Sequence, residues 1–295
     1  MKTYRLPISV TALFVLLTIG GAWLYARPQT QHLSSEAPRL SAAIAIGTAV
    51  VTPGTVAVST TTTLTVTIQV TNSSLIANGV NLIQVNASGT QSIILGVMHD
   101  DGKNGDATAG DGVYTLLVPV HPPTTGQLQF QVSAAFRGAL NRVLSNVMVV
   151  NVWNAFTNSQ FTFSFLYPPT WIVTNTSTNR KTISNGPLSS LNVDNMQNEA
   201  VVRLTLHANA NPALLPIDQW FNNYSSNGFD NPPLSVSTPT IAGRQSIELD
   251  QVDVGEFFSL FVADSADVLE VYYPLAAPQF IVQYQALIGS LQFSK

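Results

Sequence analysis

The sequence contains no cysteine among its 295 residues. This absence excludes disulfide bonds, thiolate zinc sites, a catalytic cysteine and the cysteine-linked lipid anchor of lipoproteins. Charged residues are also scarce, at 9% of the chain against about 25% in a typical globular protein. A nucleic-acid partner would require a basic face, which a net charge of −4 does not indicate. Uncharged polar residues must therefore cover most of the surface.

The N-terminal 27 residues indicate export. Lys2 and Arg5 precede an uncharged, mostly apolar stretch from Ile8 to Tyr25, and Arg27 follows it. As a helix this stretch would be about 27 Å long, close to the thickness of a bilayer core. Residues 1–27 are predicted to be either a signal peptide or an N-terminal membrane anchor, and both interpretations stay open. The positive end stays inside, so the rest of the chain is expected outside the cytoplasm, secreted or anchored.

Residues 28–41 are polar and contain two prolines, so a linker is expected there. Residues 42–152 then show the pattern of short strands. Leu64, Val66 and Ile68 alternate with polar residues, which gives one buried face and one wet face. Further strands are expected at 44–51, 80–85, 92–98, 113–120, 128–134 and 143–152, with turns at Asn78-Gly79, Ser88-Gly89 and His121-Pro122-Pro123. About seven short strands without a helical period predict an immunoglobulin-like β-sandwich.

Residues 153–295 combine strands with helices. One helix is expected from about Pro216, a residue suited to a first helical position, with Ile217 and Trp220 on its apolar face. A second is expected at 277–288, where Gly289 has the position of a C-cap glycine. Strands are expected at 201–207, 234–238, 244–250, 256–263 and 268–273. The pattern predicts an α+β domain, an antiparallel sheet packed by helices.

Four motifs in this second part resemble the PsbP-like family. They are FTFSFLYPPTW, PIDQWF, TIAGRQSIEL and a closing LIGSLQF, and they follow one another in the family's order over residues 155–295. The resemblance implies an α/β/α sandwich that serves as a binding or accessory subunit at a membrane surface, without catalysis.

The segment DDGKNGDATAGDGVYT, residues 100–115, is the most distinctive motif of the first part. It resembles the acidic loop of immunoglobulin-like modules in secreted bacterial proteins, including those called choice-of-anchor domains. The resemblance implies surface display or secretion. An exported chain without disulfides also favours a bacterial origin.

Two interpretations of this acidic loop stay open. Calcium binds six to eight oxygens on a flexible chain, and Asp101, Asp106 and Asp111 are the candidate ligands. In the alternative, the loop is a structural turn in which Asp side chains accept backbone N–H bonds and the glycines take positive φ. The turn is the preferred interpretation, and Ca²⁺ is the one cofactor that the sequence suggests.

No catalytic motif stands out elsewhere. The histidines at positions 32, 99, 121 and 207 lack the spacing of metal ligands, and no nucleophile elbow or phosphate-binding glycine loop occurs. The chain is therefore expected to be an exported, non-catalytic binding or accessory protein of the bacterial cell surface. Its partner would be an unknown protein or cell-envelope ligand, and an uncleaved N-terminal segment would add membrane contact. The alternatives are a calcium-rigidified adhesive or structural component and a hydrolase of envelope polymers.

Overall fold

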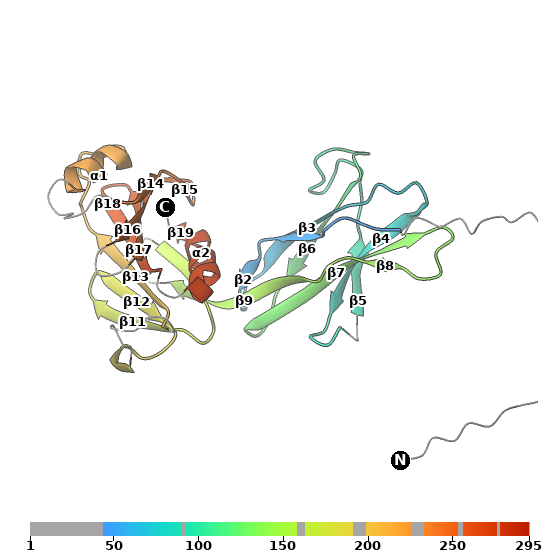
Figure 1. Ribbon diagram of the computed structural model, residues 1–295, viewed down its shortest axis with the longest axis horizontal. Helices are drawn as coiled ribbons and strands as arrows, with labels where there is room; N and C mark the ends of the chain where they lie inside the picture. The colour runs from blue at the N-terminus through green and yellow to red at the C-terminus, as the bar shows by residue number, and fades with distance from the viewer. Residues whose placement is uncertain are drawn as a thin grey trace, which may run out of the picture. The chain divides into compact units, whose positions relative to one another are not determined.

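The computed structural model describes residues 44–89, 92–157, 163–190, 199–225, 233–252, 256–275 and 278–294. Ile44–Lys295 form one compact unit. Strands dominate, and the described residues contain two α-helices (Figure 1). No helix among the described residues is long and apolar enough to cross a membrane. The predicted signal peptide or anchor (1–27) and linker (28–41) lie outside the described residues.

Two sheets enclose the first hydrophobic core. The smaller sheet has the order β1 (Val50–Thr52), β3 (Thr62–Gln69), β6 (Val113–Val120). The larger one begins with β5 (Ser92–Val97), β4 (Leu75–Val85), β7 (Gly126–Phe136) and β9 (Met148–Thr157), while β2 (Thr55–Ala57) pairs with β9 and β8 (Val143–Leu144) with β7. Inward residues of both sheets, among them Leu64, Leu82 and Phe130, form one buried cluster. The sandwich-type arrangement agrees with the predicted strand alternation.

Strand β9 continues beyond this sandwich. Its residues from Met148 to Val152 pair with β7, and its last residues pair with β10 (Phe163–Tyr167), with Phe156 opposite Phe165. β10 pairs in turn with β19 (Gln292–Phe293). The larger sheet therefore extends from the first part of the chain into the second. The expected boundary between residues 152 and 153 falls inside a continuous strand, and the division into two domains stays a prediction.

A third, antiparallel sheet carries the rest of the chain. Its order is β11 (Ile172–Ser177), β12 (Arg180–Ser184), β13 (Val201–His207), β18 (Asp267–Pro274), β17 (Glu256–Asp264), β16 (Arg244–Val252), β14 (Ser235–Ser237), and β15 (Thr240–Ile241) pairs with β16. Helix α1 (Ile217–Ser225) packs on the face that carries Phe261. Helix α2 (Ile281–Gly289), preceded by the 3-10 turn η3 (Pro278–Phe280), packs on the face that carries Leu260. Neighbouring residues of one strand point to opposite faces, so the two helices cover opposite sides of this sheet.

Two local predictions were wrong, and each has a packing reason. Asn78-Gly79 is no turn between strands but a bulge inside β4, where Asn78 has φ 55° and the register shifts. A Cβ on Gly79 would lie 2.6 Å from the carbonyl oxygen of Ile76, so glycine allows a close backbone approach there. Gly289 is the last residue of α2 instead of its cap. Ser290 ends the helix, and its hydroxyl donates to the Leu287 carbonyl at 2.6 Å.

Strand boundaries also differ from the predicted ones. The strand expected at 44–51 is reduced to β1, and the strand expected at 143–152 divides into β8 and β9. Between them Ser145 donates its backbone N–H to Val132 and accepts the Val132 N–H on its hydroxyl, both at 2.9 Å. A side chain thus replaces part of the regular ladder at this point.

Candidate functional sites

The acidic loop between β5 and β6 is organised around Asp100. Its Oδ1 accepts the backbone N–H groups of Gly110 at 2.6 Å and of Asp111 at 3.2 Å, and its Oδ2 accepts that of Gly112 at 2.9 Å. One carboxylate therefore joins the beginning of the loop to its end. Both of its oxygens are used as acceptors for the backbone, as in a structural turn.

The other three aspartates fix shorter turns within this loop. Asp106 is 8% exposed and its Oδ2 accepts the backbone N–H of Gly102 at 2.6 Å. Asp101 and Asp111 each accept the N–H group two residues further along, at 3.0 and 2.9 Å. These are Asx-type turns, in which a short acidic side chain replaces a backbone acceptor. The bonds are those that the turn interpretation predicted.

Glycine is required at two positions of the loop. Gly105 has φ 95° and Gly112 has φ 84°, backbone conformations that residues with a side chain rarely adopt. An added Cβ would lie 2.9 Å from a Leu117 methyl carbon at the first position and 2.9 Å from a Thr71 methyl carbon at the second. Backbone conformation and packing therefore both select glycine.

Three of the aspartates also come close enough to share a cation. Asp100, Asp106 and Asp111 each contribute one carboxylate oxygen to a group whose members lie within 4.8 Å of one another. The sequence named Asp101, Asp106 and Asp111 as candidate ligands, whereas this group has Asp100 in place of Asp101, whose carboxylate accepts the N–H of Lys103. A cation here would compete with the backbone N–H groups that already bind both oxygens of Asp100. Calcium binding at this loop remains a hypothesis.

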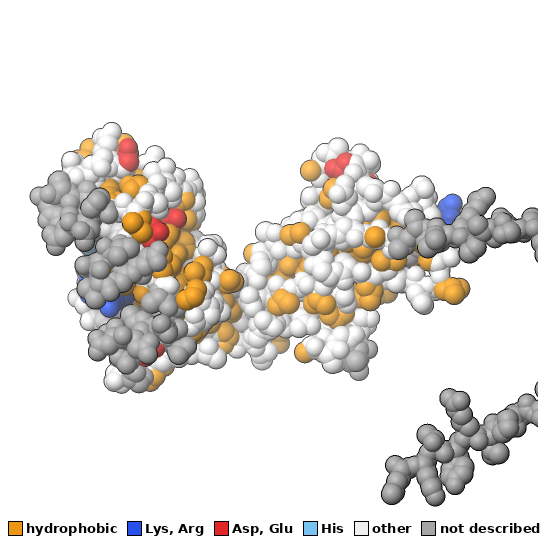
Figure 2. All heavy atoms as spheres, in the orientation of Figure 1, with side chains coloured by type: hydrophobic (Ala, Val, Ile, Leu, Met, Phe, Trp, Pro, Cys, Tyr) orange, Lys and Arg blue, Asp and Glu red, His pale blue; other side chains and the backbone are white. Residues whose placement is uncertain are grey.

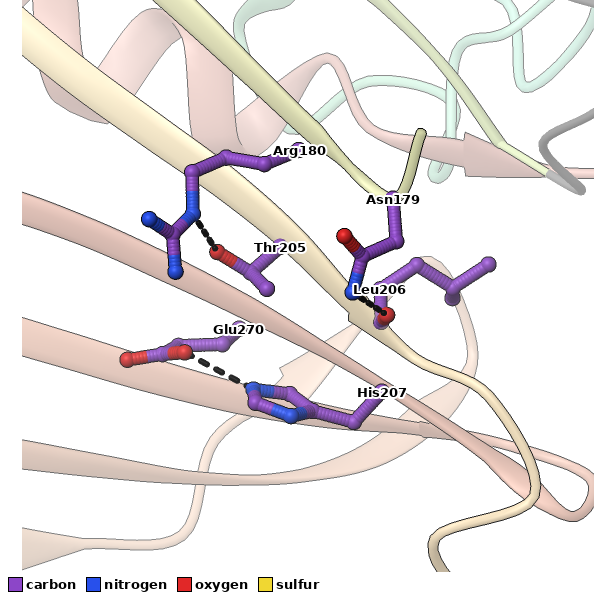
Figure 3. A network of polar contacts seen from close by, with 6 residues as sticks. All are labelled: Asn179, Arg180, Thr205, Leu206, His207 and Glu270. Carbon is purple, nitrogen blue, oxygen red and sulfur yellow. Dashed lines mark hydrogen bonds and ion pairs between the residues drawn. The ribbon is translucent and has the colours of Figure 1, made fainter. Parts of the chain in front are cut away.

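A second group of polar side chains lies on one face of the third sheet (Figure 3). His207 of β13 contacts Glu270 of β18, with 2.8 Å between Nε2 and Oε2, and both side chains are 25% exposed. Arg180 of β12 donates its Nε–H to the Thr205 hydroxyl at 3.2 Å. The strand register places Thr205 opposite both Arg180 and Glu270. We call this surface the polar face: Arg180, Arg203, Thr205, His207, Glu270 and Tyr272.

Helix α1 borders the polar face. The Tyr224 ring meets His207 edge-on at 6.0 Å between ring centroids and stacks on Trp220 at 4.9 Å. Burial and the negative charge of Glu270 raise the pKa of Tyr224. Among the described residues no serine or threonine hydroxyl bonds to His207.

Sequence reasoning missed this pair because no local pattern marks it. His207 and Glu270 are 63 residues apart in the chain, and only the pairing of β13 with β18 brings them together. A register prediction for these two strands is the one signal that could have found it.

A groove of about 380 Å³ lies on the outer face of the larger sheet, over β4, β5, β7 and β8. Its lining includes Ile83 and Val85, which are only 8% and 6% exposed although neither belongs to the sandwich core. The apolar Ile94 and Leu144, 64% and 53% exposed, also line it. The outer face of such a sheet usually carries polar residues, so this apolar lining is a departure from the expected pattern.

Polar groups lie beside the apolar ones in the groove. The Oδ1 atom of Asn81 is buried and has no hydrogen-bond partner. Arg142 is tied to the protein, since it donates to the Ser133 hydroxyl and to the carbonyls of Ser133 and Gly79, all at 2.6–2.7 Å. None of the described residues that line the groove carries a carboxylate or an aromatic ring. The alternation of β4 did not reveal this lining, because apolar residues occupy both of its faces, Val80 and Leu82 in the core and Ile83 and Val85 in the groove.

Comparisons with known proteins give no family. No protein-family model matches the chain, and no curated protein does. Three solved structures are similar at a low level. A Bacteroides thetaiotaomicron protein has 14% identity and a TM-score of 0.32, over 48% of this chain and 48% of its own. A Kfla1895 mutant in complex with isomaltose has 10% identity and a TM-score of 0.26, over 77% of this chain and 31% of its own.

The third structure, S. aureus TarS, has 10% identity and a TM-score of 0.19, over 77% of this chain and 56% of its own. The chain therefore spans less than two thirds of each of these structures. At such TM-scores the similarities support no argument about fold or function.

Proposed function

We propose that the chain is an exported, non-catalytic binding or accessory protein of the bacterial cell envelope, with an immunoglobulin-like part and a PsbP-like part. The N-terminal pattern and the two sequence resemblances support export and the accessory role. The groove on the larger sheet is the observation that carries the binding function. Its volume lies in the range of known ligand sites, and apolar surface with a few polar groups is typical of them.

The chemistry of the groove defines what it would bind. Its lining offers apolar contact from Ile83, Val85 and Ile94, with the polar side chains of Ser92 and Gln131 beside them. Among the described residues it has no carboxylate to attract a cation and no aromatic ring for stacking on sugars or bases. The ligand that fits is an uncharged segment of a polymer or protein, with an apolar group that contacts these side chains. On the face of the sandwich that Figure 2 shows, charged side chains are few.

Retention of the full-length chain on a delipidated bacterial cell-wall fraction tests this function. An Ile94→Arg variant places a charge in the groove, and we expect retention to fall about tenfold or more. Leu140→Arg is the matched control, because Leu140 is fully exposed and lies outside the groove lining. Equal retention of the parent chain and both variants would refute binding through the groove.

A calcium-rigidified adhesive component is the second candidate, favoured by the proximity of Asp100, Asp106 and Asp111. A thermal melt with EDTA and then with millimolar calcium separates the two. Calcium at about a hundredfold over its dissociation constant would add about 2.7 kcal/mol of stability. A shift of that size, abolished by Asp106→Ala, would put the adhesive function first. An unchanged midpoint would leave the loop a structural turn.

A further inference from the structure

The polar face carries two arginines on neighbouring strands. Arg180 lies in β12 and Arg203 in β13, and the register places them on the same side of the sheet, diagonal to one another across the Thr205 and Thr182 positions. Both side chains are exposed. Strands lie about 4.8 Å apart, so long side chains on diagonal positions can reach a common ligand.

Each arginine is held in place by an uncharged neighbour. Arg180 uses its Nε–H for the Thr205 hydroxyl at 3.2 Å, which leaves its terminal nitrogens free. The guanidinium carbon of Arg203 lies 5.2 Å from the centroid of the Tyr272 ring, a cation–π contact that uses none of its N–H groups. Neither arginine forms an ion pair with a carboxylate of the described residues. Two partly fixed guanidinium groups therefore present unused donors to solvent.

The acidic residue of the polar face is already engaged. Glu270 lies opposite Thr205 in the strand register, and Thr205 separates it from Arg180. Its Oε2 instead binds His207 Nε2 at 2.8 Å. Figure 3 shows the Glu270 carboxylate joined to His207, while the dashed contact of Arg180 runs to Thr205. The contrast is Arg244, whose terminal nitrogen pairs with Asp264 at 2.9 Å.

We propose that Arg180 and Arg203 together bind a phosphate group, presented by a small solute or by a lipid headgroup. One guanidinium can saturate a carboxylate in a bidentate contact, whereas a phosphate offers enough oxygens for two. Nucleic acid is a poorer fit, because a duplex or strand requires a run of positive charges along its backbone and this face has two. The site is separate from the groove and does not depend on it.

Titration of the full-length chain with inorganic phosphate tests the site, with NMR of the arginine side-chain N–H groups and, for the variants, of the backbone N–H groups of β12 and β13 as the readout. We expect saturable shifts of the Arg180 and Arg203 signals. The double variant Arg180→Gln and Arg203→Gln should bind at least about tenfold more weakly. Arg137→Gln is the matched control, since Arg137 is exposed and none of the described contacts involves its side chain. Shifts that persist in the double variant, or no shift at any concentration, would overturn the proposal.

Vesicles separate the two sources of phosphate. The full-length parent chain and the double variant are each mixed with vesicles of phosphatidylglycerol or of phosphatidylcholine. Both chains carry the same N-terminal segment, so its contribution to vesicle binding cancels in the comparison. A difference of about tenfold on phosphatidylglycerol alone identifies a lipid headgroup. Binding of inorganic phosphate without any difference on vesicles identifies a soluble ligand. A short DNA strand is the third probe. If it binds the parent chain and the double variant equally, the proposed phosphate site stands. If its binding depends on both arginines and it displaces phosphate, the proposal is overturned.

Discussion

At the scale of single residues, the Asp100 carboxylate holds the acidic loop closed. Replacing it with alanine leaves three backbone N–H groups of the loop without their acceptor. Hydrogen bonds to a charged group contribute about 1.5–3 kcal/mol each to stability when buried, and this loop is partly exposed. We expect Asp100→Ala to lower the free energy of unfolding by about 2 kcal/mol, measured by urea denaturation.

Asp101→Ala is the control for this prediction. Asp101 is exposed and accepts a single N–H bond, so its loss should cost no more than about 0.5 kcal/mol. Equal losses for the two variants would show that Asp100 does not organise the loop.

Tyr284 connects a single buried residue to alkaline stability. Burial raises its pKa to about 12 from the model-compound value of 10.0, with a smaller opposing effect of the Val201 backbone. The unfolded chain therefore loses this proton first as the pH rises. The stabilising contribution is fully present below pH 10 and is lost between about pH 10 and 12.

The measurement is the urea midpoint at pH 9 and at pH 11. We expect the midpoint to fall over this interval by more in the parent chain than in Tyr284→Phe, which fills the same space without a titrating hydroxyl. Tyr273, whose pKa is raised by burial and by Glu248, remains in both chains, and the part of its shift that Tyr284 causes is lost together with Tyr284 in the variant. Identical declines would contradict the assignment to Tyr284.

At the scale of secondary-structure elements, helix α1 depends on its packing. It has nine residues, and isolated helices of this length are marginal in water. Trp220 fixes it: the ring is 5% exposed, its Nε1–H donates to the Ala210 carbonyl at 2.8 Å, and it contacts Phe261 at 5.8 Å between centroids. We expect Trp220→Ala to cost about 3–5 kcal/mol in urea denaturation.

Tyr224 on the same helix provides the comparison. It stacks on Trp220 but is 41% exposed, so Tyr224→Ala should cost clearly less, about 1 kcal/mol. If the two variants had the same effect, the helix would not be anchored chiefly through Trp220.

At the scale of the whole molecule, two sets of buried residues share one continuous strand. Val132 belongs to the sandwich core and Leu204 to the core under α2, and each is 0% exposed. If the two parts are separate domains, calorimetry of the full-length chain should show two transitions. Val132→Ala should lower one midpoint and Leu204→Ala the other, each by several degrees. A single transition lowered by both variants would show that the pairing of β9 with β10 makes them one cooperative unit.

The sequence by itself determined the features that depend on local periodicity and local chemistry. Alternation in β3 and β7 predicted strands with one buried face, the spacing of Ile217 and Trp220 predicted α1, and the aspartates and glycines of residues 100–112 predicted the loop with its backbone bonds. Each of these signals lies within a few residues, where side-chain direction and backbone preference are fixed by neighbours in the chain.

Tertiary structure alone decided the rest, because strand register joins residues that are distant in sequence. It placed His207 beside Glu270, put Arg180 and Arg203 on one face, and exchanged Asp101 for Asp100 in the acidic cluster. It also placed Ile83 and Val85 of β4 in the groove together with Ile94 of β5 and Leu144 of β8. A shift of one residue in any of these pairings would turn the same side chains to the opposite face, so the candidate sites follow from register and not from composition.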